Sequence, residues 1–252
     1  MGIKLSKKIM SKLGKTNAEF GLIEEGDKIL VGLSGGKDSL TLVHAMCEQQ
    51  RRAPFKFEFI AATISYGMGE NYDELAKHCK EYGIEHVVHD TSVYELAKEK
   101  IRKNSSFCSF FSRMRRGYLY TLAQELGCNK LALGHHMDDA AESFFMNFIY
   151  NGQLRSLAPK YIADNGLVVI RPLIQMRERQ LRAFAEDNEL KTIGDEACPA
   201  MRFDVKMPHA RANTKEMLAT MEKEFPSLFT SLNAAFKNIS KNSFFEVEKS
   251  NI

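Results

Sequence analysis

The sequence predicts an α/β protein with a parallel five-stranded sheet and helices on both of its faces. Two observations predict this fold class. Short, mostly apolar runs of strand length alternate along the chain with longer segments of helical periodicity, an order typical of right-handed crossovers between parallel strands. The runs are apolar at consecutive positions, as expected of strands that are covered on both faces. In such sheets a ligand site lies beyond the carboxyl ends of the strands.

The amino-terminal half of the chain follows this alternation. Leu5, Ile9 and Leu13 recur on one face at helical spacing and predict a helix over residues 4–15. Gly83 ends a later helix, as glycine often does at a helix C-terminus. The strands expected in this half cover residues 28–33, 57–64 and 85–89, and the helices that follow them cover 37–51, 70–82 and 93–101.

The carboxyl-terminal half repeats the pattern, beginning with a long helix over residues 109–126 that ends at Gly127. Strands are expected at 130–133 and 167–170, and helices at 138–150 and 177–189. We therefore expect three parts: a helix and lead-in over 1–27, a sheet domain over 28–205, and a helical extension over 206–252.

The composition fits a globular cytoplasmic protein. A chain of 252 residues with 44% hydrophobic content is long enough for one large α/β domain or two small ones. It has no apolar run of membrane-spanning length and no signal peptide, so no membrane partner is expected. Five cysteines at irregular spacing do not match a disulfide framework, and a net charge of +3 argues only weakly for a nucleic-acid partner.

A glycine-rich turn follows directly on the first expected strand and reads Ser34-Gly35-Gly36-Lys37-Asp38-Ser39. Two glycines let backbone N–H groups approach an anion, and the helix that starts here adds its positive N-terminal dipole. Lys37 supplies a full charge, while Ser34 and Ser39 supply hydroxyl donors. The turn is therefore predicted to bind phosphate.

Two other interpretations of this turn fit less well. An ordinary P-loop needs four residues between its first glycine and a Gly-Lys-Ser/Thr ending, but three residues separate Gly32 from Gly36 and Asp38 follows Lys37. A tight turn without a ligand would gain nothing from a lysine and an aspartate inside it.

A second motif, Leu131 to Asp139, ends another strand and opens another helix. Asp38, Asp138 and Asp139 are candidate magnesium ligands at strand ends. For Asp138 and Asp139 the alternative is helix N-capping, which acidic residues perform at any first turn. Both motifs are thus expected at the same edge of the sheet.

Three further polar residues follow strand ends. His135 and His136 lack a nearby Cys-x-x-Cys to complete a zinc site, so a phosphate contact or packing is expected of them. Arg171 ends the last expected strand and either binds a phosphate or forms an ordinary salt bridge.

These motifs, together with Cys108–Gly117 and Arg171-Pro172-Leu173, resemble the tRNA 2-thiocytidine biosynthesis family of the PP-loop, or N-type ATP pyrophosphatase, superfamily. The resemblance spans about residues 5 to 200. It implies an adenine nucleotide alpha hydrolase-like fold, with ATP and Mg²⁺ as cofactors. It also implies that ATP is cleaved between its alpha and beta phosphates to adenylate cytidine 32 of tRNA, before sulfur displaces AMP.

The resemblance assigns roles to residues of this chain. ATP binding is expected of Ser34, Gly35, Gly36, Lys37, Asp38, Ser39, His135 and Arg171, with Lys37 also catalytic. Arg113, Arg115 and Arg116, with Lys7 and Lys8, are expected to contact tRNA, although each basic run could also be a solvated helix face. The sulfur donor would be a cysteine desulfurase or sulfide, and a homodimer is one candidate assembly.

The chain departs from the family at its cysteines. Family members carry Cys-x-x-Cys and a third cysteine that hold an iron–sulfur cluster, whereas here Cys108 and Cys198 match two of these positions and Phe111 takes the third. Two thiolates are a poor set for a [4Fe–4S] cluster. Cys108 and Cys198 are therefore expected either to hold a weakened cluster with other ligands or to act catalytically as a persulfide carrier and its resolving thiol.

Two other functions remain open from the sequence. A tRNA lysidine synthetase would use the same ATP chemistry without cysteines, but the context of Cys108 and the Arg113–Gly117 run argue against it. A nucleotide- or RNA-binding paralogue without catalysis would not need Lys37, Asp38 and Asp138, which are all present.

Overall fold

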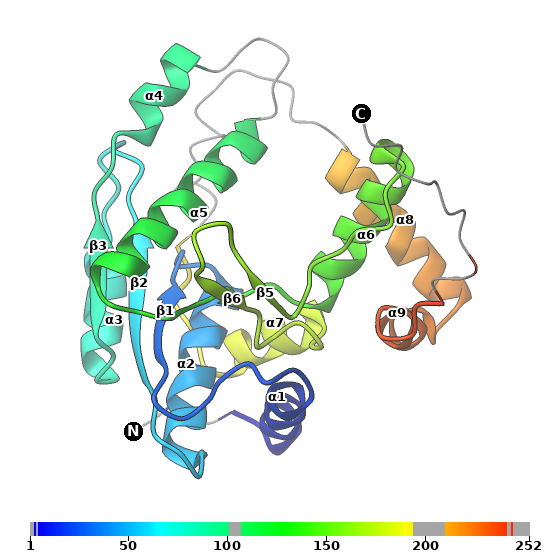
Figure 1. Ribbon diagram of the computed structural model, residues 1–252, viewed down its shortest axis with the longest axis horizontal. Helices are drawn as coiled ribbons and strands as arrows, with labels where there is room; N and C mark the ends of the chain where they lie inside the picture. Colours follow the sequence, from blue (N-terminus) through cyan, green and yellow to red (C-terminus); the bar gives the residue numbers. More distant parts are fainter. Residues whose placement is uncertain (1–2, 4, 101–106, 194–209, 241–242, 244–252) are drawn as a thin grey trace.

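The computed structural model describes residues 3, 5–100, 107–193, 210–240 and 243, except for the side chains of residues 98–100 and 107–109. A central sheet is covered by helices on both faces (Figure 1). Its strands are β1 (Lys28–Gly32), β2 (Glu58–Ile64), β3 (His86–His89), β4 (Lys130–Ala132), β5 (Lys160–Ile162) and β6 (Val168–Ile170). Their order across the sheet is β3-β2-β1-β4-β6-β5.

The helices before, between and after the strands also follow the expected alternation. They are α1 (Lys7–Phe20), α2 (Lys37–Arg52), α3 (Asp73–Glu81), α4 (Val93–Lys100), α5 (Phe107–Glu125), α6 (Met137–Asn151), α7 (Glu178–Asp187), α8 (Ala210–Glu224) and α9 (Leu228–Ala235). Among the residues described, no helix combines the length and the apolar character needed to cross a membrane.

The predicted sheet is confirmed with one correction, because it has six strands rather than five. The five expected strands pair in parallel, and β5 joins β6 antiparallel at the edge. The hairpin turns at Asn165-Gly166, where Gly166 has φ +83° and the Ala163 amide donates to the Leu167 carbonyl at 2.9 Å. An Asn-Gly pair between apolar residues is a hairpin signal, so the sequence contained the evidence for this strand.

The first helix differs from its predicted range of 4–15. The hydroxyl of Ser6 accepts a hydrogen bond from the Ile9 amide, which makes Ser6 the N-cap and starts the helix at Lys7. The helix continues to Phe20 and ends at Gly21, whose φ of +55° suits a glycine C-cap. The apolar stripe of this helix marked its buried face correctly but not its ends.

Strand β1 is buried on both faces and organises the two halves of the core. Ile29 and Val31 belong to the cluster that α1, α2 and α7 form on one face of the sheet. Leu30 points the other way, into a cluster with Leu119 and Ala123 of α5. Because alternate residues of a strand face opposite sides, this short apolar run can hold both layers to the sheet.

The order of the strands places the site. The chain passes from β1 to its neighbour β2 on one side, and the later strand β4 pairs with β1 on the other side. A crevice opens at such a reversal, outside the carboxyl ends of the two strands. The loops after β1 and β4, which carry the two predicted motifs, therefore meet there.

A buried lysine lies at the amino-terminal ends of the strands, opposite the two motifs. Lys130, at the start of β4, is 3% exposed, and its ammonium lies 2.7 Å from Asp27 Oδ2 and 2.7 Å from Glu24 Oε2. It also donates to the Leu22 carbonyl at 3.0 Å. Asp27, 5% exposed, accepts a further hydrogen bond from Asn129. This group of charges joins the lead-in after α1 to the sheet.

We predict that Lys130→Met lowers the free energy of unfolding by about 3 kcal/mol, because it leaves the Asp27 carboxylate buried without its cation. Lys28→Met, at the half-buried first residue of β1, serves as the control. It should change the free energy of unfolding by less than about 0.5 kcal/mol. Urea unfolding of the three proteins measures both values. A loss below about 1 kcal/mol for Lys130→Met would show that this ion pair does not hold the lead-in to the sheet.

Candidate active site

The glycine-rich loop after β1 is shaped by one glycine that no other residue could replace without strain. Gly35 has φ +82°, and a Cβ there would lie 2.6 Å from the side chain of Ile193. The Ile193 amide also donates to the Gly35 carbonyl at 2.9 Å. Ile193, in the segment that follows α7, thus packs against the loop and fixes its conformation.

The two serines of the loop have different surroundings. The hydroxyl of Ser39, which is buried, donates to the Gly36 carbonyl at 2.9 Å and accepts from the Ser34 amide at 3.1 Å. Ser34 is exposed, and its hydroxyl lies 3.2 Å from that of Ser39. Ser39 therefore closes the loop internally, while Ser34 presents a hydroxyl towards a ligand.

The two predicted motifs touch each other. A Cβ at Gly134 would lie 3.2 Å from the backbone carbonyl of Asp38, so the strand-end loop after β4 packs directly on the first turn of α2. Sequence analysis did not single out Gly134. The signal was a glycine between an apolar strand and a histidine pair, which marks a close approach of two backbones.

A cavity of about 410 Å³ lies between these loops. One part is lined by Ser34, Gly36, Asp38 and Ser39 of the first loop and another by Gly134, His135 and Asp139 of the second. Apolar residues Ala62, Ile64 and Leu119 line a third part, which suits a flat base. Arg115 of α5 and Arg211 of α8 also line the cavity.

Lys37 is held at the mouth of the loop between two carboxylates. Its ammonium lies 3.1 Å from Asp38 Oδ2 and 3.2 Å from Glu178 Oε1. Burial opposes its charge, but these two carboxylates raise the pKa of Lys37 above its usual value. The lysine therefore stays charged, and two of its three N–H donors are already directed.

Glu178, the first residue of α7, connects this lysine to the carboxyl-terminal extension. Its other oxygen, Oε2, lies 2.9 Å from the ammonium of Lys215 in α8. Burial works against the ionised carboxylate, but hydrogen bonds from Lys215 and Lys37 lower the pKa of Glu178 to about 2. Sequence analysis missed Glu178, because a glutamate in the first turn of a helix is unremarkable.

Asp38 has the free oxygen that a cation requires. Its Oδ1 is buried and has no hydrogen-bond partner among the described residues, whereas its Oδ2 contacts Lys37. Carboxylate oxygen is the ligand that Mg²⁺ prefers, with water and phosphate oxygens completing the shell. The described part of the chain contains no cluster of three or more side chains that could hold a metal ion.

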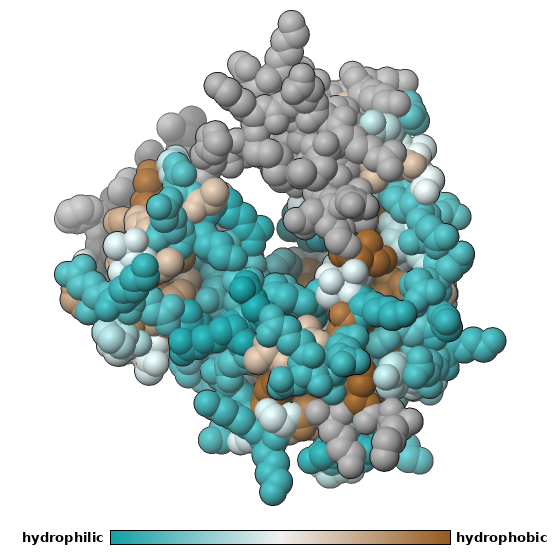
Figure 2. Space-filling model, turned by 180° about the vertical axis from the view of Figure 1, so that it is seen from behind, coloured by the Kyte–Doolittle hydropathy of each residue, from teal (hydrophilic) through white to brown (hydrophobic). Residues whose placement is uncertain are grey.

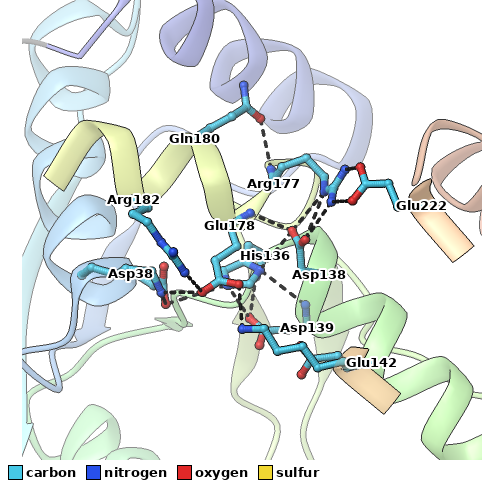
Figure 3. A network of polar contacts seen from close by, with 12 residues as sticks. Asp38, His136, Asp138, Asp139, Glu142, Arg177, Glu178, Gln180, Arg182 and Glu222 are labelled. Atoms are coloured by element: carbon cyan, nitrogen blue, oxygen red, sulfur yellow. Dashed lines mark hydrogen bonds and ion pairs between the residues drawn. The ribbon is translucent and has the colours of Figure 1, made fainter. Parts of the chain in front are cut away.

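The other two candidate magnesium ligands are engaged in capping (Figure 3). His136 and Asp139 form a capping box at the start of α6, in which the His136 amide donates to Asp139 Oδ2 at 3.0 Å. Asp138 accepts from the Glu178 amide at 2.7 Å and from Arg177 Nε at 3.1 Å, so it caps α7. Asp139 thus caps its own helix, as the alternative interpretation of the sequence allowed, whereas Asp138 caps the neighbouring helix α7.

His135 lies at the cavity wall, and Arg171 contacts it from the side away from the cavity. Arg171 is 4% exposed and donates from Nε to His135 Nδ1 at 3.3 Å, while its Nη1 donates to the Ala158 carbonyl. His135 lines the cavity, and burial, followed by the charge of Arg171, lowers its pKa to about 4. At neutral pH it is an uncharged ring, and Arg171 acts on the cavity through it.

The basic residues predicted to contact RNA lie on two separate parts of the molecule. Arg113 and Arg116 are exposed on α5, and Arg115, between them, lines the cavity. Lys7 instead lies in a groove with Arg52, near the start of β2 and away from the carboxyl ends of the strands. Lys8, on the same helix as Lys7, is exposed.

The position of Phe111 bears on the cysteine chemistry. Phe111 is 3% exposed and packs edge-on against Tyr66, with 5.8 Å between ring centres, in a small apolar cluster with Val93 and Ala97. Cys108 has a described backbone in α5 but its side chain lies outside the described part, as does all of Cys198. Phe111 is thus a buried packing residue of α5.

The other three cysteines do not reach the cavity. Cys47, Cys79 and Cys128 are free thiols in helices or at a helix end. Burial raises the pKa of Cys47 and of Cys79 to about 11, so both are thiols at neutral pH.

Comparison with known proteins places this geometry in a family. The sequence pattern of the PP-loop domain matches residues 5–207. The tRNA-cytidine(32) 2-sulfurtransferase of Geobacter metallireducens is 44% identical over 92% of this chain and 90% of its own, and that of Geobacter sulfurreducens is 42% identical over 96% and 93%. Among solved structures, the U34-tRNA thiolase NcsA of Methanococcus maripaludis with its [4Fe–4S] cluster superposes with a TM-score of 0.72 at 25% identity, covering 93% of this chain and 79% of that one.

The ion pairs of Glu178 predict a pH dependence. Because the pKa of Glu178 is lowered on folding, its carboxylate stabilises the protein above the pKa of the unfolded chain, and this contribution is lost as the pH falls towards 2. Glu178→Gln should therefore be less stable than the wild type at pH 7, and the difference should shrink below about pH 4.5. Chemical unfolding from pH 7 to pH 3 measures it, with the exposed Glu186→Gln of the same helix as control. A difference that does not change with pH would contradict the ionic role.

Proposed function

The chain belongs to the PP-loop family and, within it, to the tRNA-cytidine(32) 2-sulfurtransferases, and on this premise we propose that it thiolates cytidine 32 of tRNA at the expense of ATP. The observation that carries the proposal is the loop Ser34–Ser39, with Lys37 held charged beside a cavity lined by both strand-end motifs. Such an enzyme must bind a triphosphate and an RNA base next to each other. The cavity offers polar loop residues for the first and apolar walls for the second.

The residues present account for the adenylation step. The amides of the loop and Lys37 bind the beta and gamma phosphates, and they neutralise the charge that develops on the departing pyrophosphate. The carbonyl oxygen of cytidine attacks the alpha phosphate and becomes the adenylate. Since Lys37 is already directed by Asp38 and Glu178, it does not have to reorganise during the reaction.

Asp38 is the residue that we propose to hold magnesium, through the buried Oδ1 that lacks a partner among the described residues. The ion would bring charge neutralisation to the phosphate oxygens. Asp138 and Asp139 support this site indirectly, because they cap the helices that position Glu178 and His136.

The tRNA is proposed to approach over α5, where Arg113 and Arg116 are exposed on either side of the cavity residue Arg115. Sulfur then displaces AMP from the activated carbon of the base. The sulfur comes from outside the chain, from a cysteine desulfurase or from sulfide.

For the sulfur step we propose that Cys108 receives sulfane sulfur from a cysteine desulfurase as a persulfide, and that this sulfur attacks the activated carbon and displaces AMP. Cys198 then attacks Cys108 Sγ, which releases the thiolated base and leaves a Cys108–Cys198 disulfide for an external thiol to reduce. Sulfide cannot form this persulfide without an oxidant, so as a donor it would attack the carbon directly.

The support for the persulfide is the packing of Phe111, which stands at the position expected for the second thiolate on α5 and fills it with an aromatic ring. Iron–sulfur clusters are usually held by three or four thiolates. A persulfide needs one reactive thiolate and access to it.

Lys37→Ala should lower the rate of tRNA-dependent pyrophosphate release by roughly a hundredfold, as removal of one preorganised charge contact does. The exposed Lys77→Ala of α3 is the matched control and should react at the wild-type rate. A coupled pyrophosphate assay with ATP, Mg²⁺ and tRNA decides between them. Wild-type turnover in Lys37→Ala would mean that the loop is not the catalytic site.

Anaerobically purified protein should contain far fewer than four irons per chain and lack the visible absorbance of a cluster. The physical reason is the missing thiolate at Phe111. Phe111→Cys, which restores the Cys-x-x-Cys spacing with Cys108, should raise the iron content. Iron and sulfide analysis of both proteins is the measurement, and close to four irons per wild-type chain would overturn the persulfide proposal.

A further inference from the structure

Helix α8 lies beyond the part of the chain that the PP-loop domain pattern covers, yet it contacts the site. The pattern ends at residue 207, and α8 begins at Ala210. One face of α8 carries Arg211, Lys215 and Glu222, at helical spacings of four and seven residues. These side chains pair with Asp139, Glu178 and Arg177 respectively.

Arg211 is the residue of this face that lines the cavity. Its Nε donates to Glu142 Oε2 at 2.7 Å and its Nη2 donates to Asp139 Oδ1 at 2.7 Å. Its Nη1 has no partner among the described residues, and the side chain is 65% exposed. Two carboxylates therefore fix the guanidinium in place and leave Nη1 available to a ligand.

Arg115 reaches the same cavity from the other side. Helix α5 stands on one side of the carboxyl edge of the sheet, and α6 with α8 stands on the other (Figure 1). The back of the molecule is mostly polar and is hollowed near its centre (Figure 2). His135, which lies at the cavity wall, feels the positive charge of both Arg115 and Arg211.

Arg115 and Arg211 both line the cavity beside the uncharged His135, so the two arginine side chains border the same space. Arginine is well suited to phosphate because of its planar set of N–H donors, and a phosphate in this space can accept from both. The loop Ser34–Ser39 with Lys37 already provides for the triphosphate. The arginines therefore provide for a second phosphate.

The exposed residues of α5 indicate where this second phosphate comes from. Arg113 and Arg116 are exposed next to Arg115, so positive charge continues from the outer surface of α5 into the cavity. A nucleic-acid strand carries a phosphate at each nucleotide and can bind along such a row of positive charges. A free nucleotide would not need the outer part of it.

We propose that Arg115 and Arg211 together bind a backbone phosphate of the tRNA beside the target nucleotide. Arg211 thereby makes α8 a part of the RNA site. This inference rests on the proposed function, since it takes tRNA to be the substrate. Arg211 positions the strand, and Asp139 and Glu142 hold Arg211.

The test is the binding of an unmodified tRNA transcript by full-length Arg211→Gln. Its Kd for tRNA should rise about tenfold, which is the order of one charged hydrogen bond, and the salt dependence of binding should fall by about one unit of slope. The KM for ATP should stay within about twofold, because the triphosphate is held elsewhere. Lys223→Gln, an exposed position on the same helix, is the control and should keep wild-type tRNA binding.

Glutamine at 211 leaves the buried Glu142 without its cation, so Glu142→Gln combined with Arg211→Gln gives a second variant that avoids this loss. Thermal unfolding shows which of the two is folded. A folded variant that binds tRNA as tightly as Lys223→Gln would overturn the proposal. A rise in the KM for ATP with unchanged tRNA binding would also overturn it, since the phosphate would then belong to the nucleotide.

The proposed function can fail separately from this inference. Pyrophosphate release by the wild-type protein with the same transcript is measured alongside. Its absence would contradict thiolation, whereas loss of tRNA binding in Arg211→Gln tests only the phosphate contact.

Discussion

The site depends on the close contact between Gly134 and the backbone of Asp38. Because β1 and β4 are neighbours and run in parallel, the loops at their carboxyl ends meet, and a side chain at Gly134 would press on the backbone of Asp38. The contact places the phosphate-binding loop beside the capping box of α6. The cavity, the charged lysine and the uncharged His135 all take their positions from it.

A second level of organisation is electrostatic and joins α2, α6, α7 and α8. Lys37 contacts Glu178, Glu178 contacts Lys215, and Arg177 contacts both Asp138 and Glu222. Positive and negative groups alternate through this network, so none of these partly buried charges stands unpaired. The helix beyond the PP-loop domain therefore contributes to the same charge balance as the loop that binds the triphosphate.

Most of the fold followed from the sequence, because it rests on local patterns. Apolar runs and glycine positions predicted five strands, their parallel orientation and both strand-end motifs. Strand β5 was missed because its three residues, Lys160–Ile162, are only partly apolar and none of them is fully buried, although Asn165-Gly166 signalled its hairpin. The roles of Glu178 and Arg211 could not have been predicted, since their partners lie far away in the sequence. Spacing shows which residues share a helix face but not which distant side chain meets them.

The most direct test of the account is mass spectrometry of tRNA nucleosides from a strain that lacks this gene. The account predicts that 2-thiocytidine disappears from the digested tRNA, and that it returns with the wild-type gene but not with Lys37→Ala. Unchanged 2-thiocytidine in the deletion strain would contradict thiolation of cytidine as the function of this protein.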